Sequence, residues 1–380
     1  MVSSAKHLRV LHICQRDDLA TGGAARVAVE YVKRLPNYEV DARCLFLYGS
    51  PGYFQSELGV SAHYLGIKNS QDFGKFGRLT KFIKQFQPDI IHHHDGLLWS
   101  HLLTFFHPGI FKVTHAHLGA NSNSFSPRNI VAAWLQRQST NLLICITEDT
   151  RNSQIEQGGY KQNRTYVLYN GVERSRFKPP TPTQIAFARK NFQLTEHARV
   201  VGFVGRLHCE MKGTDDFLRM IALLPSNYVG LVVGSGPDAD QLKQLAQTLK
   251  ISQRVVFTGI IENTAVAYHA MNVFCLTSHW EPFGLVVAEA MACGLPIVSL
   301  SCTGGVNELL TKETGFLLPD RDLEKMAQAA IEAVEHPEVG RERSINSRLR
   351  LQQYHDWDNN TSKLANLYKN LLPLTSNLAK

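Results

Sequence analysis

The chain has 380 residues, of which 44% are hydrophobic, 19% charged and 9% aromatic. This length predicts two domains, since one domain takes about 100 to 200 residues, and the composition excludes a disordered or fibrous chain. Forty Lys and Arg against 33 Asp and Glu give a formal net charge of +7, which favours anionic partners such as nucleotides, phosphates or acidic lipids.

Short β-branched stretches alternate with amphipathic helical stretches along most of the chain, which is the pattern of βαβ units and parallel sheets. The first half has strand candidates at residues 8–14, 40–46, 63–65, 89–93, 112–115, 142–147 and 166–169. The helical patterns between them lie at residues 24–35, 76–86 and 149–157. The second half has strand candidates at residues 200–204, 228–233, 255–258, 273–276, 297–299 and 315–317. Its helices are expected near residues 214–224, 238–249, 263–271, 287–292 and 323–334.

A Pro-rich stretch from Phe177 to Thr183 separates the two series, and we place the interdomain linker there. The predicted fold is α/β, with two Rossmann-like, doubly wound parallel-sheet domains facing a cleft. The first domain is expected at residues 1–178 and the second at residues 186–357. Folds of this kind bind ligands at the carboxyl ends of their strands, so the cleft is the predicted site.

Cysteine usage and hydropathy indicate the compartment. The seven cysteines are scattered and form no Cys-x-x-Cys pair, which is typical of reduced thiols in a cytosolic protein. No stretch of about 18 apolar residues and no signal-peptide pattern is found. We therefore expect a cytoplasmic protein, with any membrane association peripheral and on the inner face.

The densest motif runs from Ser278 to Pro296 and contains Glu281 and Glu289 with seven residues between them. A Pro-Phe-Gly turn follows Glu281, and the predicted helix after it carries Glu289. If that helix starts near Phe283, its free N–H groups and dipole point toward Glu281 and form a site for an anion or a hydroxyl-rich ligand. The structural alternative is that Glu281 caps the helix and Glu289 lies on a solvated face.

With its surroundings, this segment resembles the retaining nucleotide-sugar glycosyltransferases of family 4, also described as glycosyl transferases group 1, which have the GT-B fold. The resemblance covers nearly the whole chain. Besides the two glutamates, the stretches that carry it are residues 21–26, 89–94, 170–173, 204–213, 233–237, 257–259 and 304–308.

The resemblance implies roles for individual residues. Arg206 and Lys212 follow the first strand of the second half, where two cations would neutralise a diphosphate leaving group without a metal; a solvated basic turn is the alternative. Glu281 is implied to contact sugar hydroxyls and Glu289 the ribose diol. The backbone N–H groups implied to bind the sugar or the phosphate are those of Phe283, Gly284 and Leu285.

Glycine turns are the other implied nucleotide contacts. Gly22 and Gly23 follow the first strand and open a helix, so their N–H groups could approach phosphates; the turn lacks the G-x-G-x-x-G of an NAD site. The resemblance adds Gly234, Gly259 and Ile260. Because the base is bound largely by backbone groups near Gly259 and Ile260, the choice between UDP and GDP rests on frequency alone, which favours UDP.

Histidines cluster in the first half. The spacing of two places His92 with His94, and His115 with His117, on common strand faces. A zinc site built from these imidazoles and Asp95 is one interpretation. The family works without a metal, however, so we expect neither a metal nor any cofactor besides the donor substrate.

His117 aligns loosely with the active-site histidine of the family, which is usually followed by Asp. Here Leu118 follows, so His117 either lines the sugar site or has a purely structural role.

Two further segments bear on partners. Residues 75–84 form a basic amphipathic helix that could touch anionic lipid; the alternative is a solvated face over a core stripe of Phe76, Leu79, Phe82 and Ile83. Trp357 and a helix at residues 361–372 resemble the family's terminal segment, so about residues 358–380 are expected to pack on the first domain. Nucleic acid is not an expected partner, because zinc-finger spacing and RNA-binding aromatic signatures are absent from the sequence.

The sequence thus predicts a metal-independent retaining glycosyltransferase (EC 2.4) that moves a sugar from a UDP-sugar, or from GDP-mannose, to a glycan or lipid-linked acceptor. The family commonly works in cell-surface polysaccharide synthesis. The alternatives are another GT-B enzyme, such as a sugar-nucleotide epimerase or an inverting transferase, and a non-catalytic two-domain sugar-binding protein.

Overall fold

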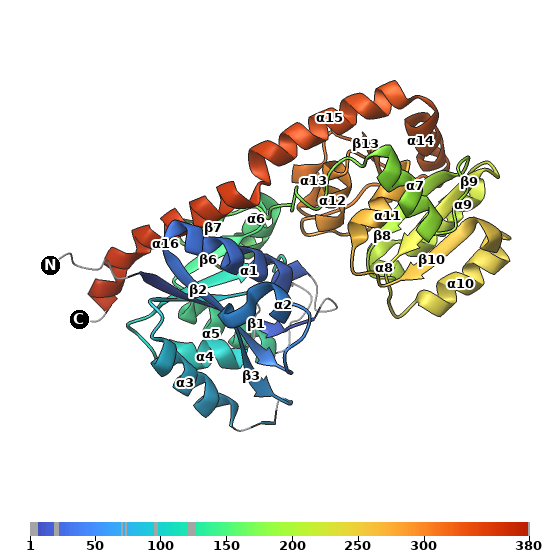
Figure 1. Cartoon of the computed structure of the whole chain (residues 1–380). Helices are drawn as coiled ribbons and strands as arrows, with labels where there is room; N and C mark the ends of the chain where they lie inside the picture. Colours follow the sequence, from blue (N-terminus) through green and yellow to red (C-terminus); the bar gives the residue numbers. More distant parts are fainter. Residues whose placement is uncertain are drawn as a thin grey trace. The chain divides into compact units, whose positions relative to one another are not determined.

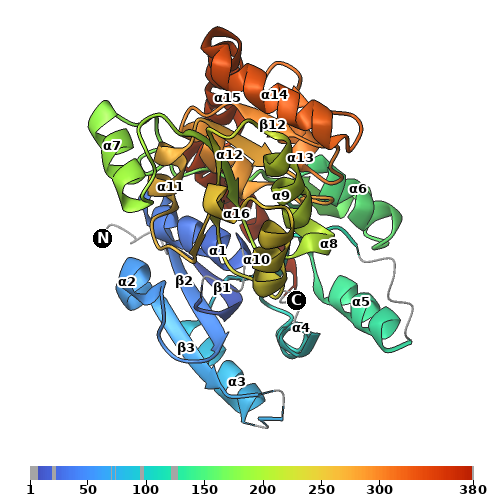
Figure 2. The same ribbon diagram turned by 90° about the vertical axis from the view of Figure 1, so that its right-hand side faces the viewer.

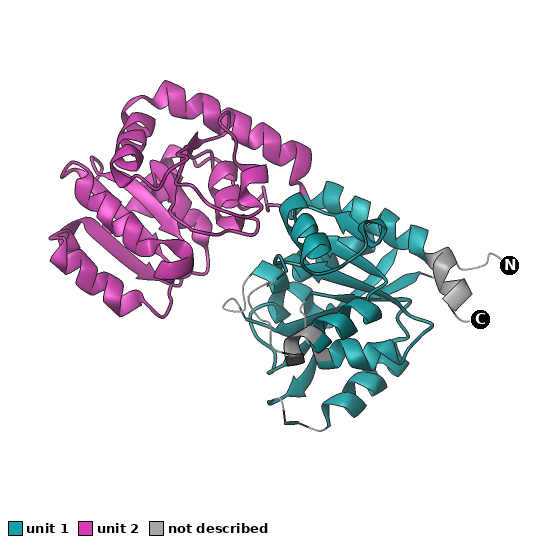
Figure 3. Ribbon diagram, turned by 180° about the vertical axis from the view of Figure 1, so that it is seen from behind, with its two compact units in different colours: residues 1–170, 357–380 teal, residues 171–356 magenta. Residues whose placement is uncertain are grey.

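The computed structural model describes residues 7–18, 23–69, 71–72, 74–94, 98–120 and 127–378. The chain divides into two compact units, which Figure 3 colours separately. Unit 1 comprises residues 1–170 and 357–380, and unit 2 comprises residues 171–356. Each unit contains one parallel sheet and its helices (Figure 1), so the prediction of two parallel-sheet α/β domains is confirmed.

The sheet of unit 1 has seven strands in the order β3-β2-β1-β4-β5-β6-β7. They are β1 (Leu8–Arg16), β2 (Val40–Tyr48), β3 (Ala62–Ile67), β4 (Ile90–His93), β5 (Phe111–Ala116), β6 (Leu142–Cys145) and β7 (Thr165–Val167). The order reverses between β1 and β4, which are hydrogen-bonded neighbours with His12 paired to His92. Such a reversal is the usual ligand-binding edge of a doubly wound sheet.

The helices of unit 1 cover both faces of this sheet. They are α1 (Gly23–Arg34), α2 (Gln55–Leu58), α3 (Lys75–Phe86), α4 (Leu98–Phe105), α5 (Pro127–Ser139), α6 (Glu148–Glu156) and α16 (Trp357–Leu378), with short 3-10 turns at Leu35–Tyr38, Gly59–Ser61 and Gln162–Arg164. Strand β1 shows the two faces, because Val10 and Cys14 join one core with α1 and α16 whereas Leu11 and Ile13 join another with α3. The period of two is that of a strand buried on both sides.

Helix α16 follows unit 2 in the sequence but belongs to unit 1, where it lies beside α1 (Figure 1). Trp357 is buried and its ring meets that of Tyr31 edge-on, with 5.2 Å between the ring centroids. Leu364 and Tyr368 are fully buried in the same core. The core of unit 1 is therefore built from two separate pieces of chain.

The sheet of unit 2 has six strands in the order β10-β9-β8-β11-β12-β13. They are β8 (Arg199–Val204), β9 (Tyr228–Val233), β10 (Val255–Gly259), β11 (Val273–Leu276), β12 (Ile297–Ser299) and β13 (Phe316–Leu317). The helices are α7 (Pro182–Asn191), α8 (Cys209–Lys212), α9 (Thr214–Leu223), α10 (Ala239–Thr248), α11 (Thr264–Ala270), α12 (Leu285–Ala292), α13 (Val306–Leu309), α14 (Leu323–Glu335) and α15 (Pro337–Tyr354), with a 3-10 turn at Ser252–Arg254. This order reverses between β8 and β11.

The division between the units falls at Asn170 and Gly171, ahead of the Pro-rich stretch on which the sequence places the linker. The reason is that the residues between these two points are tied into unit 2. The Val172 N–H donates to the His355 carbonyl at 2.9 Å, and the Phe177 ring packs against that of Tyr268. The Pro-rich stretch then leads into α7 within unit 2.

No helix within the described part of the chain is both long and apolar enough to cross a membrane.

Helix α3, which lies beside the edge strand β3 (Figure 2), buries Leu79 and Ile83. Phe76 is 41% exposed and so is not part of the buried stripe that the sequence pattern suggests.

Candidate active site

In unit 2, the reversal of strand order lies between β8 and β11, where ligands of doubly wound sheets bind. The segment after β8 contains Arg206 and ends in α8 with Lys212. The segment after β11 contains Glu281 and leads through Gly284 into α12. The predicted catalytic residues of unit 2 therefore follow the two strands at this reversal.

Lys212 and Glu281 form an ion pair across the two segments. The Lys212 ammonium donates to Glu281 Oε2 at 2.5 Å, and both side chains are largely shielded, at 14% and 10% exposure. The Ser278 hydroxyl donates to the same carboxylate oxygen at 3.3 Å. Helix α8 places Lys212 because it ends at Gly213, whose φ of 58° is left-handed. The pair holds one positive and one negative group next to each other at the carboxyl edge of the sheet.

A second glycine holds the Glu281 segment in place. Gly304 has a φ of +101°, and a Cβ atom built there would lie 2.5 Å from the Glu281 carbonyl oxygen. The Glu281 N–H donates to the Thr303 carbonyl at 2.9 Å. Only a residue without a side chain allows this approach, so the position of the Glu281 backbone depends on Gly304.

Helix α12 begins next to Glu281. Gly284 is its N-cap, with a φ of 87°, and as a glycine it has no side chain to cap the helix. Phe283 is buried and Leu285 half-buried. The first turn of a helix carries unsatisfied N–H groups and a partial positive charge, so this end favours an anion or sugar oxygens.

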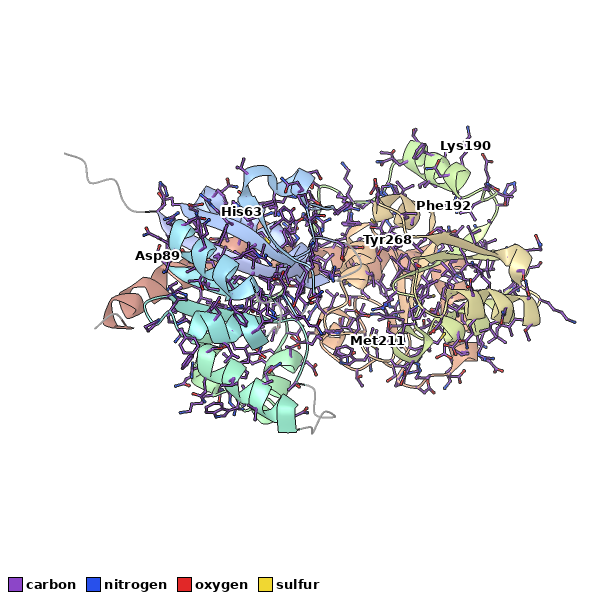
Figure 4. The ribbon with its side chains drawn as sticks, turned by 90° about the horizontal axis from the view of Figure 1, so that it is seen from below. His63, Asp89, Lys190, Phe192, Met211 and Tyr268 are labelled. Carbon is purple, nitrogen blue, oxygen red and sulfur yellow. The ribbon has the colours of Figure 1, made fainter. Side chains whose placement is uncertain are left out.

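Glu289 lies on α12 and accepts a hydrogen bond from the Tyr268 hydroxyl, 2.9 Å from Oε2. The same hydroxyl contacts the Val286 carbonyl at 3.1 Å. Burial and the charge of Glu289 raise the pKa of Tyr268 well above its ordinary value, so the tyrosine is a neutral donor. Figure 4 labels Tyr268 on α11 and Met211 on α8, both in unit 2.

Gly234 and Gly259, the two other glycines of unit 2 that the sequence singles out, let neighbouring loops touch through their backbones. The Gly234 N–H donates to the Gly259 carbonyl at 2.9 Å. A Cβ atom at Gly234, where φ is +130°, would lie 1.9 Å from the Gly205 carbonyl oxygen. Beside them, Ile260 is 66% exposed. The ends of β8, β9 and β10 are thereby held together, and Arg206 on the first of these loops is exposed.

The sequence names the site residues but not their partners. The structure adds Ser278 and Tyr268, each bonded to one of the two glutamates. Ser278 is the first residue of the recognised motif, and its position three residues before Glu281 is the only sequence signal for it. Tyr268 comes from another helix, and only the packing of α11 against α12 reveals it.

The predicted residues of the first half lie in unit 1. Gly22 lies outside the described residues, as does Asp95, and Gly23 begins α1. His117 follows β5 and is half-buried, and burial lowers its pKa to about 3. Its Nε2 lies 3.2 Å from His94 Nδ1.

His117 belongs to a stack of five imidazoles that also includes a residue the sequence analysis does not single out. His12 of β1 lies against His92 and His94, with 4.9 and 5.1 Å between ring centroids. His115 stacks on His92 at 5.2 Å and on His117 at 4.6 Å. The pairing of β1 with β4 brings His12 into the stack, and no local pattern in the sequence predicts that pairing.

Burial keeps these imidazoles neutral. It lowers the pKa of His12 to about 3. It also lowers the pKa values of His92, His94 and His115 well below their ordinary value, an effect to which repulsion among the histidines adds.

Comparison with known proteins gives two family matches. Residues 198–336 match the model described as glycosyl transferases group 1. Residues 21–176 match the model described as glycosyltransferase family 4. Together the matches take in every strand of both sheets except β1, and they include Arg206, Lys212, Glu281 and Glu289.

Several relatives are similar over most of their length. An uncharacterized glycosyltransferase of Haemophilus influenzae is 26% identical over 346 residues, which are 88% of this chain and 93% of the relative. The lipopolysaccharide core biosynthesis glycosyltransferase LpsD of Rhizobium meliloti is 27% identical over 347 residues, 88% of this chain and 90% of the relative. A glycogen synthase of Mycobacterium tuberculosis is 29% identical over 302 residues, 75% of this chain and 69% of the relative.

Solved structures share the fold. Anabaena Alr3699/HepE in complex with UDP-glucose superimposes with a TM-score of 0.84 at 24% sequence identity, covering 96% of this chain and all of that one. WaaG, a glycosyltransferase involved in lipopolysaccharide biosynthesis, gives a TM-score of 0.73 at 17% identity, covering 94% of this chain and 99% of that one. With both halves matched in sequence and the whole chain matched in fold, this chain belongs to the family 4 glycosyltransferases and is a transferase of the GT-B type.

Proposed function

We propose that the chain transfers a sugar from a nucleotide-diphosphate sugar to a glycan or lipid-linked acceptor, with retention of the anomeric configuration and without a metal ion in the reaction. The observation that carries this proposal is the Lys212–Glu281 pair beside the start of α12. It offers a cation and helix N–H groups for a leaving diphosphate, together with a carboxylate for sugar hydroxyls. A sugar-binding protein has no departing diphosphate to stabilise, and an epimerase is distinguished by a reaction that consumes no acceptor.

The proposed step breaks the bond between the sugar C1 and the diphosphate oxygen. Negative charge then develops on the diphosphate, where Lys212, the exposed Arg206 and the first N–H groups of α12 stabilise it. The acceptor hydroxyl attacks C1 from the face that the diphosphate leaves, and its proton passes to a phosphate oxygen. Glu281 orients the sugar by accepting hydrogen bonds from its hydroxyls and forms no covalent bond. His117 is proposed as a further contact of the sugar.

Glu289 is proposed to accept both hydroxyls of the ribose, with the Tyr268 hydroxyl orienting its carboxylate at 2.9 Å. Backbone groups near Gly259 and Ile260 would bind the base. UDP is the favoured nucleotide, and the Anabaena structure is a complex with UDP-glucose; GDP-mannose is the alternative donor. A role in cell-surface polysaccharide synthesis is in keeping with the names of the LpsD and WaaG proteins. The inner face of the membrane is the proposed location.

A thermal-shift panel of UDP, GDP and ADP tests the donor site without an acceptor. A ligand at about 100 times its dissociation constant stabilises the folded state by about 2.7 kcal/mol, so we expect a selective rise in melting temperature with UDP. Glu289→Gln should reduce that rise, and Glu332→Gln, on the exposed face of α14, should leave it unchanged. A panel in which no nucleotide changes the melting temperature would contradict the proposed donor site.

Stereochemistry and metal use are tested with the active enzyme. NMR of the product should show the anomeric configuration of the donor, and an inverted product would refute the retaining mechanism. Transfer should proceed at the same rate with and without added Mg²⁺ or Mn²⁺, and dependence on either ion would refute metal independence.

A further inference from the structure

The five stacked histidines of unit 1 come from three adjacent strands, β1, β4 and β5, where the strand order reverses. Four of them lie towards the carboxyl ends of β4 and β5, and His12 lies in the middle of β1, paired with His92. On β1, β4 and β5, the residues two positions earlier on the same face are Val10, Ile90 and Val113, which belong to the apolar core under α1 and α16. The same columns continue as His12, as His92 and His94, and as His115 and His117. On β4 and β5 the residues therefore change from apolar side chains to imidazoles towards the edge where doubly wound sheets bind ligands. On β1, His12 lies between the core residues Val10 and Cys14.

Hydrogen bonds order part of this cluster. His12 Nδ1 and His94 Nε2 are 2.8 Å apart, and His94 Nδ1 lies 3.2 Å from His117 Nε2. His92 Nδ1 is hydrogen-bonded to the Tyr368 hydroxyl of α16. In both His92 and His94, Nδ1 thus contacts a group that can accept its proton, which leaves the lone pair on Nε2.

Several ring nitrogens lack such a partner. Among the described residues, the Nε2 atoms of His12 and His92 and both ring nitrogens of His115 are buried without a hydrogen bond. These three residues are at most 2% exposed. Burying an unsatisfied polar atom is costly, and such atoms are rare in folded proteins. Such nitrogens also occur at His63, His93, His101 and His269, but in this cluster they lie beside the proposed ligand-binding edge, where they leave lone pairs for a bound species.

We propose that His12, His92 and His94 bind one transition-metal cation of the zinc class. One ligand atom from each of the three side chains falls within 4.8 Å of the others. Because the His92 and His94 rings are stacked, the imidazoles must turn about their side-chain bonds to direct these nitrogens at one ion. Imidazole nitrogens suit Zn²⁺, Cu²⁺ and Ni²⁺, whereas Mg²⁺ and Ca²⁺ require oxygen ligands. Metal-bound histidines characteristically donate their second ring N–H to an outer acceptor, and the Tyr368 hydroxyl and His117 Nε2 stand in those positions.

The proposed metal site would affect the folding of unit 1 and the proton positions on its histidines, and it would take no part in glycosyl transfer. The ion would link β1 to β4 and, through Tyr368, to α16, so its binding would contribute to the folding of this unit. Coordination at His94 Nε2 keeps the proton of His94 on Nδ1. His117 would then accept at Nε2 and carry its own proton on Nδ1. None of the three ligands is a residue of the proposed donor site.

The test uses the full chain, freed of metal by dialysis against a chelator. Titration with Co²⁺ should show one ion per chain with the visible absorption bands of a low-coordinate nitrogen site, and Zn²⁺ should displace it and raise the melting temperature. His12→Gln and His94→Gln should each weaken binding at least tenfold. His93→Gln is the matched control, since His93 is equally buried on β4 but contacts Thr104 and His101 on the opposite face.

The assignment is overturned if the wild type binds no Co²⁺. It is also overturned if either His12→Gln or His94→Gln still binds Co²⁺ like the wild type, or if the control His93→Gln loses binding. If His117→Gln loses metal binding and His12→Gln keeps it, the neighbouring trio of His94, His115 and His117 holds the ion instead. If a variant does not fold, X-ray absorption of the zinc-loaded wild type decides, because three or more imidazole ligands support the site and fewer refute it. The UDP thermal shift is a separate readout, so failure of this proposal and failure of the donor site are distinguishable.

Discussion

Lys212 and Glu281 meet at a place where water is largely excluded from both, so removing either charge leaves the other without compensation. We expect Glu281→Gln to lower the rate of sugar transfer at least about 100-fold, in the range seen when a transition-state contact is lost. It should also lower the free energy of unfolding by about 1 to 3 kcal/mol. The UDP thermal shift should persist, because Glu281 is proposed to contact the sugar and not the nucleotide.

The measurement is a steady-state rate together with a melting curve for wild type, Glu281→Gln and Glu210→Gln. Glu210 is an exposed glutamate of α8 and should behave as wild type. A Glu281→Gln variant with near wild-type transfer would refute the role assigned to this carboxylate.

Lys112 is a second charge placed where water is scarce. It is 7% exposed, its ammonium donates to the His107 carbonyl at 2.7 Å, and burial lowers its pKa to about 8. In the unfolded chain the pKa of lysine is about 10.4. Below pH 8 the folded protein carries the full cost of the buried charge, and this cost disappears as the pH rises from 8 towards 10.4.

Lys112→Met should therefore raise the melting temperature of unit 1 relative to wild type at pH 7, and the difference should shrink at pH 10. The charge contribution at pH 7 is at most roughly 3 kcal/mol, which is the pKa difference converted at 1.36 kcal/mol per unit. Melting curves at both pH values measure it. A difference between variant and wild type that stays the same at pH 7 and pH 10 would argue against the buried charge as the cause.

Single residues show where sequence reasoning succeeds and where it stops. Glu281 and Glu289 stand out because seven residues separate them on one segment, whereas Lys212 and the roles of all three residues come from the resemblance to family 4 and stay predictions. His12 is not identifiable in this way, since it becomes part of the histidine cluster only through the pairing of β1 with β4. Contacts that depend on strand order cannot be read from local spacing.

Among the elements, the loop that carries Glu281 has its shape set by the glycine opposite it. Gly304→Ala would place a Cβ atom 2.5 Å from the Glu281 carbonyl oxygen, in addition to the strain of a φ of +101°. We expect it to destabilise unit 2 by roughly 2 kcal/mol or more and to reduce transfer, because the Glu281 segment must shift.

Gly66→Ala serves as its control. Gly66 also has a positive φ, of +64°, but a Cβ atom there meets nothing within 4 Å, so only the backbone strain of about 1 kcal/mol should appear. Melting temperatures and transfer rates of the two variants measure the difference. Equal effects of the two substitutions would show that the contact with Glu281 is unimportant.

Helix α3 is the element proposed to touch an anionic membrane. It buries Leu79 and Ile83 and exposes Phe76, Lys81 and Lys84. A lysine near an anionic membrane surface contributes about 1 kcal/mol to binding. Reversing both charges, Lys81→Glu with Lys84→Glu, should therefore reduce binding to phosphatidylserine vesicles at least tenfold in a co-sedimentation assay.

Neutral phosphatidylcholine vesicles and the variant Lys190→Glu are the controls for this assay. Lys190 is an exposed lysine of α7 in unit 2 (Figure 4), and its replacement should leave vesicle binding unchanged. Wild-type protein that fails to sediment with anionic vesicles would refute the membrane contact.

All the strands can be predicted from the sequence, but some of the helices cannot. Each strand candidate in the sequence has a counterpart among β1 to β13, because short β-branched stretches are a local signal. Helix α15 has no apolar stripe to reveal it, since its buried positions are Gly340, Ser344, Ser347 and Leu351. Its Ser344 hydroxyl donates to the Gly294 carbonyl at 2.7 Å, so this helix packs through small and polar side chains.

In the molecule as a whole, each unit has its own core, and Trp357 belongs to only one of them. Removing this side chain, which is 4% exposed, should destabilise unit 1 by about 3 to 5 kcal/mol. In a calorimetric scan, Trp357→Ala should lower the melting temperature of unit 1 and leave the transition of unit 2, and its UDP shift, in place.

Trp134→Ala is the matched substitution for this scan, because Trp134 lies on α5 of the same unit and is 50% exposed. It should change the melting temperature little. If Trp357→Ala lowered both transitions equally, the two units would not unfold as separate cores.

The two-part core of unit 1 has a consequence for synthesis on the ribosome. Residues 1–170 emerge first, but Trp357 and Tyr368, which complete their core, follow only after the whole of unit 2. At about 5 to 20 residues per second, the translation of unit 2 takes roughly 10 to 40 seconds. During that interval the nascent first unit exposes an apolar face and the histidine edge next to it, where chaperones can bind, while unit 2, a continuous stretch of chain, can already fold.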